Sequence, residues 1–197
     1  LDGTGLDLDA EKSWNKELGL RGVSTLLDYE LSGFHNNIEN LVAAGRGTAF
    51  KNLGKVTTMG IEARTSLLLS KTNSLLPNLN FSYALLSTKV NEGTIVSAIK
   101  SGNVQVSIEG KELPYSPNHT LTAGLEFLPL NGLLFRADVR YVSEVYTDFE
   151  NIEAQDKTGV TGPIPEYSLL NLSGFYQITD DIKLFMSAKN VTDIKYI

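Results

Sequence analysis

Charged side chains occupy the polar positions of several segments in which apolar and polar residues alternate. The clearest case is the segment 133–143, where Arg136 and Arg140 fall on the same side of the alternation as Asp138. A guanidinium group binds a carboxylate through two parallel hydrogen bonds, so the two arginines suit an anionic ligand. The other interpretation is that they pair with neighbouring acids across strands. In both cases this side must face water or matched charge.

Further cations lie in the segments that connect the alternating stretches. Arg46 and Lys51 flank a long connection over residues 37–49, and Lys100 lies in a second one over residues 87–116. Binding residues concentrate on loops that a rigid scaffold holds, although a charge in a loop is usually just solvated. The candidates for ligand contact are therefore Arg46, Lys51, Lys100, Arg136 and Arg140.

Catalytic and metal chemistry find little support in the sequence. His35 and His119 are far apart and stand in no metal-ligand spacing, and the chain has no cysteine. There is no Gly-x-Ser-x-Gly motif, and Asp180-Asp181 is typical of a turn rather than of an acid–base pair. The net charge of −6 argues against nucleic acid as a partner. We therefore expect no enzyme activity, no metal site and no cofactor.

A hairpin must position Arg136 and Arg140. Asn131-Gly132 is a strong signal for a two-residue turn of type I′, which needs positive φ at both positions. On each side, about ten residues alternate, which is also the length of a tilted strand that crosses a bilayer. A slip of one residue would exchange the two faces. The residues expected to face outward, toward lipid, are Leu121, Leu125, Phe135, Val139, Leu172 and Leu184. The residues expected to face inward are Glu126, Arg136, Asp138, Arg140 and Asn171.

The same alternation recurs along the chain and predicts eight long strands. No apolar run reaches the roughly 18 residues that a membrane helix needs. Short connections near residues 24, 74, 131 and 180 alternate with long ones over 37–49, 87–116 and 148–165, the second with a short strand at 104–109. In a meander this sorts tight turns to one rim and long loops to the other, as in transmembrane β-barrels. The expected fold class is all-β, an antiparallel up-and-down transmembrane β-barrel.

Several segments resemble the C-terminal half of the barrel of TonB-dependent outer-membrane receptors. Their order and spacing carry the resemblance over nearly the whole chain, and the phrasing is most similar to that of ferric-citrate and related siderophore receptors. The segments are E-K-S-W-N-K-E-L-G-L-R-G at 11–22, F-K-N-L-G-K-V-T-T-M-G-I-E at 50–62, E-L-P-Y-S-P-N-H-T-L at 112–121, Y-V-S-E-V-Y-T-D at 141–148, I-P-E-Y-S-L-L-N-L at 164–172 and K-N-V-T-D-I-K-Y at 189–196.

The resemblance implies a barrel of about 22 strands around a plug. Residues 1–197 would then be the C-terminal part of that barrel, with about eight strands. The family's plug domain, TonB-box region and final strand are not found in this sequence, which also lacks a signal peptide and does not begin with Met. We therefore expect the chain to be a fragment or a processed product.

The resemblance also implies a function. The receptor would import a ferric chelate, ferric citrate or another siderophore, across the outer membrane of a Gram-negative bacterium. Its partners would be the TonB complex, reached through the plug region, and the surrounding outer-membrane lipid and lipopolysaccharide. The arginines would contact the anionic chelate or acids of the plug. One alternative stays open: eight strands are enough for a small closed barrel with a structural or ligand-binding role, in which residues 13–22 would pair with 182–190.

Overall fold

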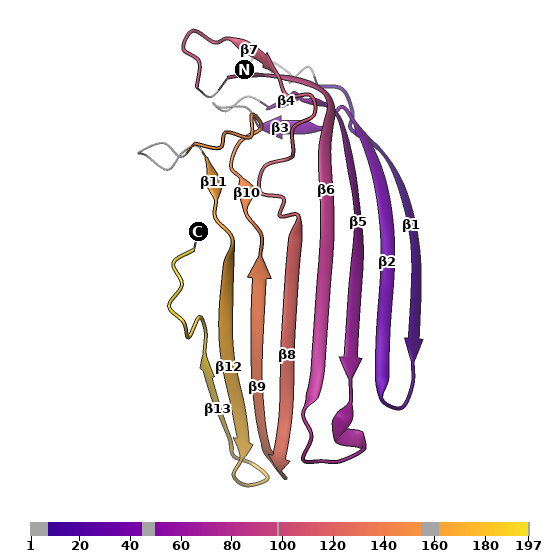
Figure 1. Ribbon diagram of the computed structural model, residues 1–197, viewed down its shortest axis with the longest axis vertical. Coiled ribbons are helices and arrows are strands. Elements are labelled where there is room, and N and C mark those ends of the chain that lie inside the picture. Colours follow the sequence, from indigo (N-terminus) through magenta and orange to yellow (C-terminus); the bar gives the residue numbers. More distant parts are fainter. Residues whose placement is uncertain (1–7, 45–49, 98, 155–161, 197) are drawn as a thin grey trace, which may run out of the picture.

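The computed structural model describes residues 8–44, 50–97, 99–154 and 162–196. Eight long strands form one curved sheet in which each strand lies antiparallel to the next one in the sequence (Figure 1). This order is the meander that the alternation of short and long connections predicts. The eight strands are β1 (Lys12–Val23), β2 (Leu27–Glu39), β5 (Gly54–Leu67), β6 (Asn78–Val96), β8 (His119–Leu130), β9 (Leu133–Val142), β12 (Tyr167–Gln177) and β13 (Lys183–Ala188).

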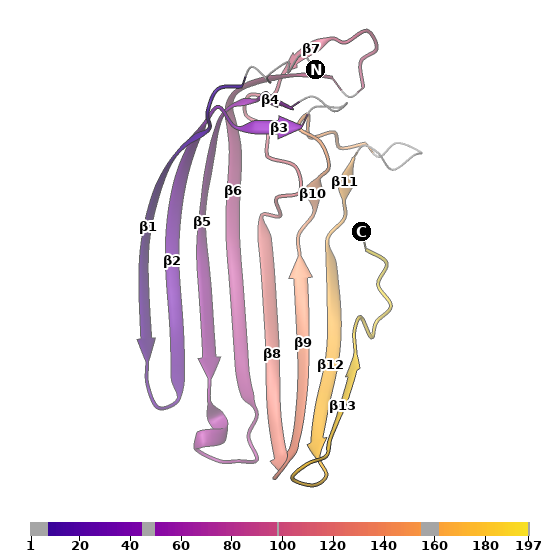
Figure 2. The ribbon, with the colours of Figure 1, turned by 180° about the vertical axis from the view of Figure 1, so that it is seen from behind.

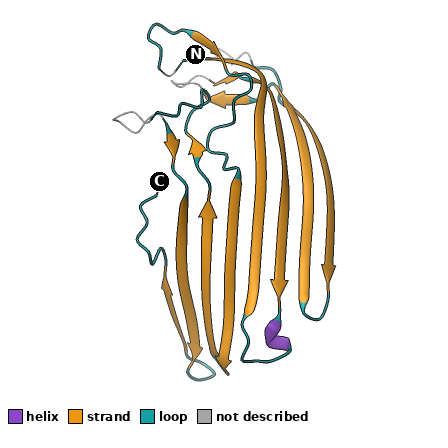
Figure 3. Cartoon of the chain, in the orientation of Figure 1, coloured by secondary structure: helices purple, strands orange, loops and turns teal. Residues whose placement is uncertain are grey.

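The connections are sorted between the two ends of the sheet, as the sequence predicts. The lower rim in Figure 2 carries the short connections, and the upper rim carries the long ones. The upper connections hold further short strands, namely β3 (Val42–Ala44), β4 (Phe50–Asn52), β7 (Gln105–Ser107), β10 (Val145–Tyr146) and β11 (Pro163–Ile164). In the described part of the chain the single helix is the 3-10 turn η1 (Leu69–Lys71) (Figure 3), which is far too short to cross a membrane.

Two of the predicted loop boundaries are wrong because strands continue past them. β2 runs to Glu39, and β6 runs to Val96 rather than ending before residue 87. The far end of β6 finds backbone partners in the segment that follows it, since Val96 pairs with Gln105 of β7. Beyond the end of β8, β6 is therefore paired with β5 as far as Gly93 and with β7 from Thr94 to Val96. The short strand expected within residues 104–109 is confirmed as β7.

The turn at Asn131-Gly132 joins β8 and β9 as predicted, but it is not of type I′. Gly132 has a φ of 81°, whereas Asn131 is not among the residues with positive φ. The register also shifts between Phe127 and Leu130. Pro129 lies inside that stretch and has no N–H to donate, which explains why the regular pairing breaks there. Leu130 still lies opposite Leu133, so the hairpin combines a bulge in β8 with a two-residue turn that has positive φ at its second position only.

The strand register assigns every long strand two faces. Residues directly opposite each other on neighbouring strands share a face. Leu125 lies opposite Ala137, which lies opposite Leu172, whereas Glu126 lies opposite Arg136. We call the first side the apolar face and the second the charged face. All six residues expected to face outward lie on the apolar face, and all five expected to face inward lie on the charged face.

The buried core lies on the charged side of the sheet, at the long-loop rim. Its fully buried members are Val56 of β5, Val90 of β6 and Ile108 of the loop after β7. Leu53 completes the cluster. Partly buried residues from all three long connections pack against it, namely Leu41, Ile95, Leu113 and Phe149. The long loops therefore fold inward over the charged face and leave the apolar face uncovered.

The closed eight-stranded alternative is not favoured. β1 pairs with β2 and β13 pairs with β12, and among the described residues the two edge strands do not pair with each other. The sheet is an open, curved wall, and it agrees with a portion of a larger barrel.

Candidate functional site

One row of polar side chains crosses the charged face from β1 to β9. The register brings together Arg64 of β5, Ser82 of β6, Thr122 of β8 and Arg140 of β9. Toward β1 the same row continues through Glu30 and ends at Arg21, since these residues pair across β2. At about 4.8 Å between strands, Arg64 and Arg140 stand roughly 14 Å apart with two hydroxyl groups between them. The row therefore offers guanidinium and hydroxyl donors in line.

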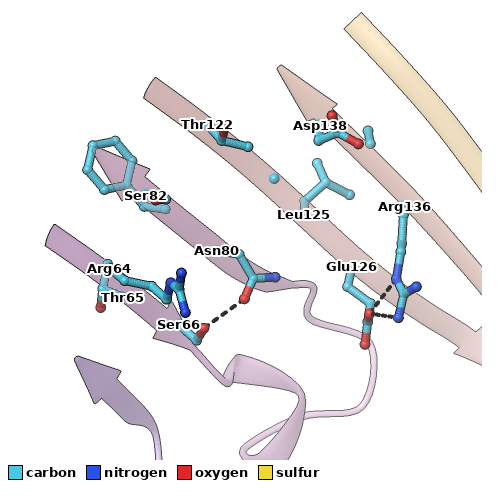
Figure 4. A pocket seen from close by; sticks show the side chains of 13 residues that line it. Arg64, Thr65, Ser66, Asn80, Ser82, Thr122, Leu125, Glu126, Arg136 and Asp138 are labelled. Carbon is cyan, nitrogen blue, oxygen red and sulfur yellow. Dashed lines mark hydrogen bonds and ion pairs between the residues drawn. The ribbon is translucent and has the colours of Figure 1, made fainter. Parts of the chain in front are cut away.

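A hollow of about 340 Å³ lies on this face, just toward the tight-turn rim from the row (Figure 4). Arg64 borders it at one side and Arg136 at the other, with Ser82 and Thr122 between them. A second hollow of about 270 Å³ adjoins it and shares Arg64 and Ser82 with the first. Glu30 and Glu62 line the second hollow. The surface thus alternates cationic and anionic side chains rather than forming one basic patch.

Arg136 is paired with an acid. Its Nε and Nη2 donate to the same oxygen of Glu126, at 2.7 and 2.6 Å (Figure 4). Next to it, Asn171 donates to Asp138 at 2.8 Å and accepts a hydrogen bond from the backbone of Asn190 at 3.0 Å. For Arg136 the structure therefore supports pairing across strands rather than a free binding group.

Arg64 and Arg140 differ from Arg136, since neither makes an ion pair or a side-chain hydrogen bond within the described residues. Both side chains are exposed on the charged face. A guanidinium without a partner retains all its donors for a ligand or for another part of the protein. These two are the groups best suited to meet an anion.

The loop candidates do not join this surface. Lys100 is exposed in the connection between β6 and β7, where its backbone N–H donates to Ser97 Oγ at 3.1 Å, and it does not line either hollow. Lys51 belongs to β4, but its side chain lies outside the described residues, as does the whole of Arg46. The structure thus brings together Arg136 and Arg140 alone among the predicted ligand contacts.

The described part of the loop layer is acidic rather than basic. Burial, together with the nearby carboxylates of Glu153, Glu112 and Glu144, raises the pKa of Tyr146 in β10. Ser97 donates to both oxygens of Glu150, at 3.1 and 2.9 Å. This part of the layer is held by its own contacts and offers no cluster of cations to an anionic ligand.

Arg64 is an inward-pointing arginine in the sequence, but it is not among the five residues predicted to contact ligand. Its inward direction follows from the alternation, but its place in a row with Arg140 depends on the register across β6 and β8. β5 and β6 are joined by the turn at 68–77, which contains η1, whereas β6 and β8 are joined by the long connection over residues 97–118. Alternation within each strand does not give the register across such connections, so the row was not predictable residue by residue.

Comparison with known proteins agrees with this architecture. Residues 2–191 match the family described as "TonB dependent receptor-like, beta-barrel". Among solved structures, the ferric citrate transporter FecA in its unliganded form is 24% identical, with a TM-score of 0.77 over 94% of this chain and 27% of that one. The ferric yersiniabactin uptake receptor FyuA of Yersinia pestis is 18% identical, with a TM-score of 0.73 over 96% of this chain and 26% of that one.

A third structure is the ferric-catecholate import receptor Fiu of K12 E. coli, which is 18% identical with a TM-score of 0.68 over 99% of this chain and 26% of that one. At these identities the likeness shows the fold. The chain spans about a quarter of the length of the proteins that it matches.

Proposed function

The chain belongs to the TonB-dependent receptor β-barrel family, and from this premise we propose that it is part of the barrel wall of a receptor that imports a ferric chelate. Members of this family are receptors and transporters of the Gram-negative outer membrane. The proposed cargo is ferric citrate or another anionic siderophore complex, and the energy comes from the TonB system. In this proposal the charged face lines the lumen, and the apolar face contacts lipid.

The row from Arg64 to Arg140 carries the proposal. A ferric chelate of this class presents carboxylate or catecholate oxygens, and guanidinium groups match such oxygens with paired donors. Between the two arginines stand the hydroxyls of Ser82 and Thr122, which also donate hydrogen bonds. Because the row runs across the strands, an anion at this level of the wall meets guanidinium and hydroxyl donors side by side.

The acids of the same wall limit how tightly an anion is held. Glu30 and Glu62 border the second hollow beside Arg64. Alternating charge weakens the binding of any single anion and supports passage rather than retention. The same pattern suits contact with a plug domain, whose own charged groups would meet both signs on the wall.

Transport is tested by iron uptake in cells. The full-length receptor that contains this chain is expressed in a Gram-negative strain that lacks its own ferric-citrate receptor. Uptake of radiolabelled ferric citrate is then measured. We expect uptake that disappears in a strain without TonB. The double variant R64Q/R140Q should need at least tenfold more ferric citrate for half-maximal uptake, since the loss of even one hydrogen bond to a charged group costs about 1.5–3 kcal/mol.

Lys71→Gln in η1 is the matched control, because it removes one exposed cation at the tight-turn rim and should leave uptake unchanged. Heat-modifiable migration on gels reports whether each variant forms the barrel. Assembled receptor that takes up neither ferric citrate nor a catecholate siderophore above the level of receptor-free cells would refute the proposal.

A further inference from the structure

A second kind of groove lies on the apolar face, near the long-loop rim of β1, β2, β5 and β6. Its volume is about 530 Å³, and its apolar lining includes Leu18, Ile61 and Leu85. Gly33 lies between them in the register, opposite Leu18 on one side and Ile61 on the other. A Cβ added to Gly33 would meet a single atom within 4 Å, the Gly60 carbonyl oxygen at 3.8 Å, so the missing side chain leaves open space in the groove.

Polar and cationic side chains stand at the end of the groove that is nearer the long-loop rim. Lys16 lies directly opposite His35, and Met59 separates His35 from Ser87 in the same row. Lys89 follows Ser87 by two residues along β6, and therefore lies on the same face. Within the described residues, none of these four polar side chains has a hydrogen-bond or ion-pair partner.

The acids of this face leave that cationic end largely uncompensated. Glu92 is engaged by Lys55 at 3.1 Å, beyond Lys89 on the same rim. Glu39 lies at the end of β2 opposite Lys12, four positions beyond the row of Lys16 and His35. Glu17 also borders the groove, but it alternates with Lys16 and Leu18 along β1, so its side chain belongs to the charged face. Lys16, at the groove, and Lys89, beside it, therefore present two positive charges on the apolar face.

The position of the groove matches the depth at which lipid headgroups begin. Trp14 precedes Lys16 by two residues and therefore lies on the same face, nearer the long-loop rim; its side chain is 74% exposed. Tryptophan and lysine side chains concentrate at membrane interfaces, where one end of the side chain is apolar and the other is wet. The long loops of such barrels lie on the extracellular side, so this end meets the outer leaflet.

We propose that this groove binds a phosphorylated glycolipid of the outer leaflet. One acyl chain lies along Leu18, Ile61 and Leu85 over Gly33. A phosphate of the headgroup lies between Lys16 and His35, with Lys89 and the Ser87 hydroxyl completing its contacts. This site depends on the membrane orientation of the barrel and not on which cargo the receptor carries.

A larger groove elsewhere on the apolar face lacks the cations of the proposed site. It has a volume of about 540 Å³ and is lined by Leu125, Leu172 and Ala188 among others. Its one charged lining residue is Arg136, whose guanidinium is turned to Glu126 on the charged face. Its lining is mostly apolar and offers no cation on this face, so it can take acyl chains but should not select a phosphorylated headgroup, and it provides an internal comparison.

The test is native mass spectrometry of the purified full-length receptor in detergent. The protein is titrated with bisphosphorylated lipid A, with dephosphorylated lipid A and with inorganic phosphate. We expect saturable binding of bisphosphorylated lipid A and at least tenfold weaker binding of the other two probes. The variant K16Q/H35Q/K89Q should weaken bisphosphorylated lipid A binding by about thirtyfold or more, because the two lysines alone contribute about 1 kcal/mol each near an anionic headgroup.

A second variant separates the apolar contact from the charge. Gly33→Leu fills the groove without a backbone clash and should also lower lipid A occupancy, while the cations remain. Controls with matched changes are Lys71→Gln at the opposite rim and Ala188→Leu in the uncharged groove, and both should bind as the unchanged protein does.

Three outcomes would overturn the proposal. They are equal binding of lipid A with and without phosphate, occupancy by inorganic phosphate at the same concentrations, or binding unaffected by both the triple variant and Gly33→Leu. Because no iron chelate is present in this measurement, a failure of the proposed transport function would leave its result unchanged.

Discussion

The two faces of this sheet obtain their cover from different sources. The charged face is covered at one end by the chain itself, where the loops bury Val56, Val90 and Ile108 completely. On the apolar face nothing from the described chain covers Leu18, which is 83% exposed, or Phe135, which is 49% exposed. A water-soluble sheet would bury the second face and expose the first. The difference shows that the apolar face needs lipid, whereas the charged face needs water, a ligand or a plug.

The largest loss of stability is expected from a substitution at the loop-covered end of the charged face. Ile108→Ala removes a fully buried side chain and should destabilise the docking of residues 99–118 by about 2–5 kcal/mol. Hydrogen exchange of these backbone amides in the assembled receptor should speed up accordingly, while β9 remains protected. Val104→Ala is the control, since Val104 is exposed in the same loop. Equal exchange in both variants would contradict the buried loop core.

The comparison of faces is sharpest between neighbouring residues on β8. Leu125 lies on the apolar face, and Gly124 lies on the charged face opposite Asp138. Leu125→Arg should destabilise the inserted barrel by about 2–4 kcal/mol if it lies near the bilayer midplane. Gly124→Arg should cost much less, because an added Cβ meets its neighbours at ordinary distances of 3.5 Å and more.

Urea titration of barrels folded into lipid vesicles measures both variants, and the unfolding midpoints give the difference between them. A similar loss of stability for Leu125→Arg and Gly124→Arg would break the comparison, because it would mean that the two faces meet the same medium.

The polar contacts of the charged face should contribute less to the stability of the barrel than the placement of Leu125 on the apolar face. Asn171→Ala removes the hydrogen bonds to Asp138 and from the Asn190 backbone, and should cost about 1 kcal/mol for each lost bond. Ser173→Ala, two residues along the same face, is the control because no side-chain hydrogen bond of Ser173 is seen in the described structure. Vesicle unfolding in urea should separate the two variants, and identical midpoints would show that the Asn171 contacts add nothing.

The ion pair on that face should have the smallest effect. Glu126→Gln breaks the pair with Arg136, whose side chain is 57% exposed. Exposed pairs are worth about 0–1 kcal/mol, so the unfolding midpoint should shift only slightly and should shift less in high salt. A loss above about 2 kcal/mol would mean that the lumen around Arg136 is much drier than the open hollow indicates.

The faces of the strands were predictable from sequence, while their ends were not. Period-two alternation assigns Leu121 and Glu126 to opposite sides, because side chains on a strand point to alternate faces. The extension of β6 to Val96 depends on pairing with β5 and then with β7, which are contacts between segments rather than properties of residues 87–96. The turn at Asn131-Gly132 was placed correctly, but the bulge beside it, at Pro129, was not predicted.

The candidate site was predictable only in part for the same reason. Arg136 and Arg140 share a face because they are four residues apart on one strand, which the alternation alone establishes. The register between strands determines that Arg136 forms an ion pair with Glu126 and that Arg140 shares a row with Arg64. Alternation within a strand carries no information about its register with the next.

The central claim is tested most directly by labelling consecutive positions of β9. Residues 1–197 contain no cysteine. In a full-length receptor whose other cysteines, if present, are replaced by serine, single cysteines are placed at each residue from 135 to 140 and spin-labelled in lipid vesicles. We predict that oxygen, which concentrates in lipid, reaches the labels at 135, 137 and 139 preferentially. A water-soluble nickel complex should reach those at 136, 138 and 140. Accessibility without a two-residue period, or with the two sets exchanged, would contradict a barrel wall with a lipid side and a lumenal side.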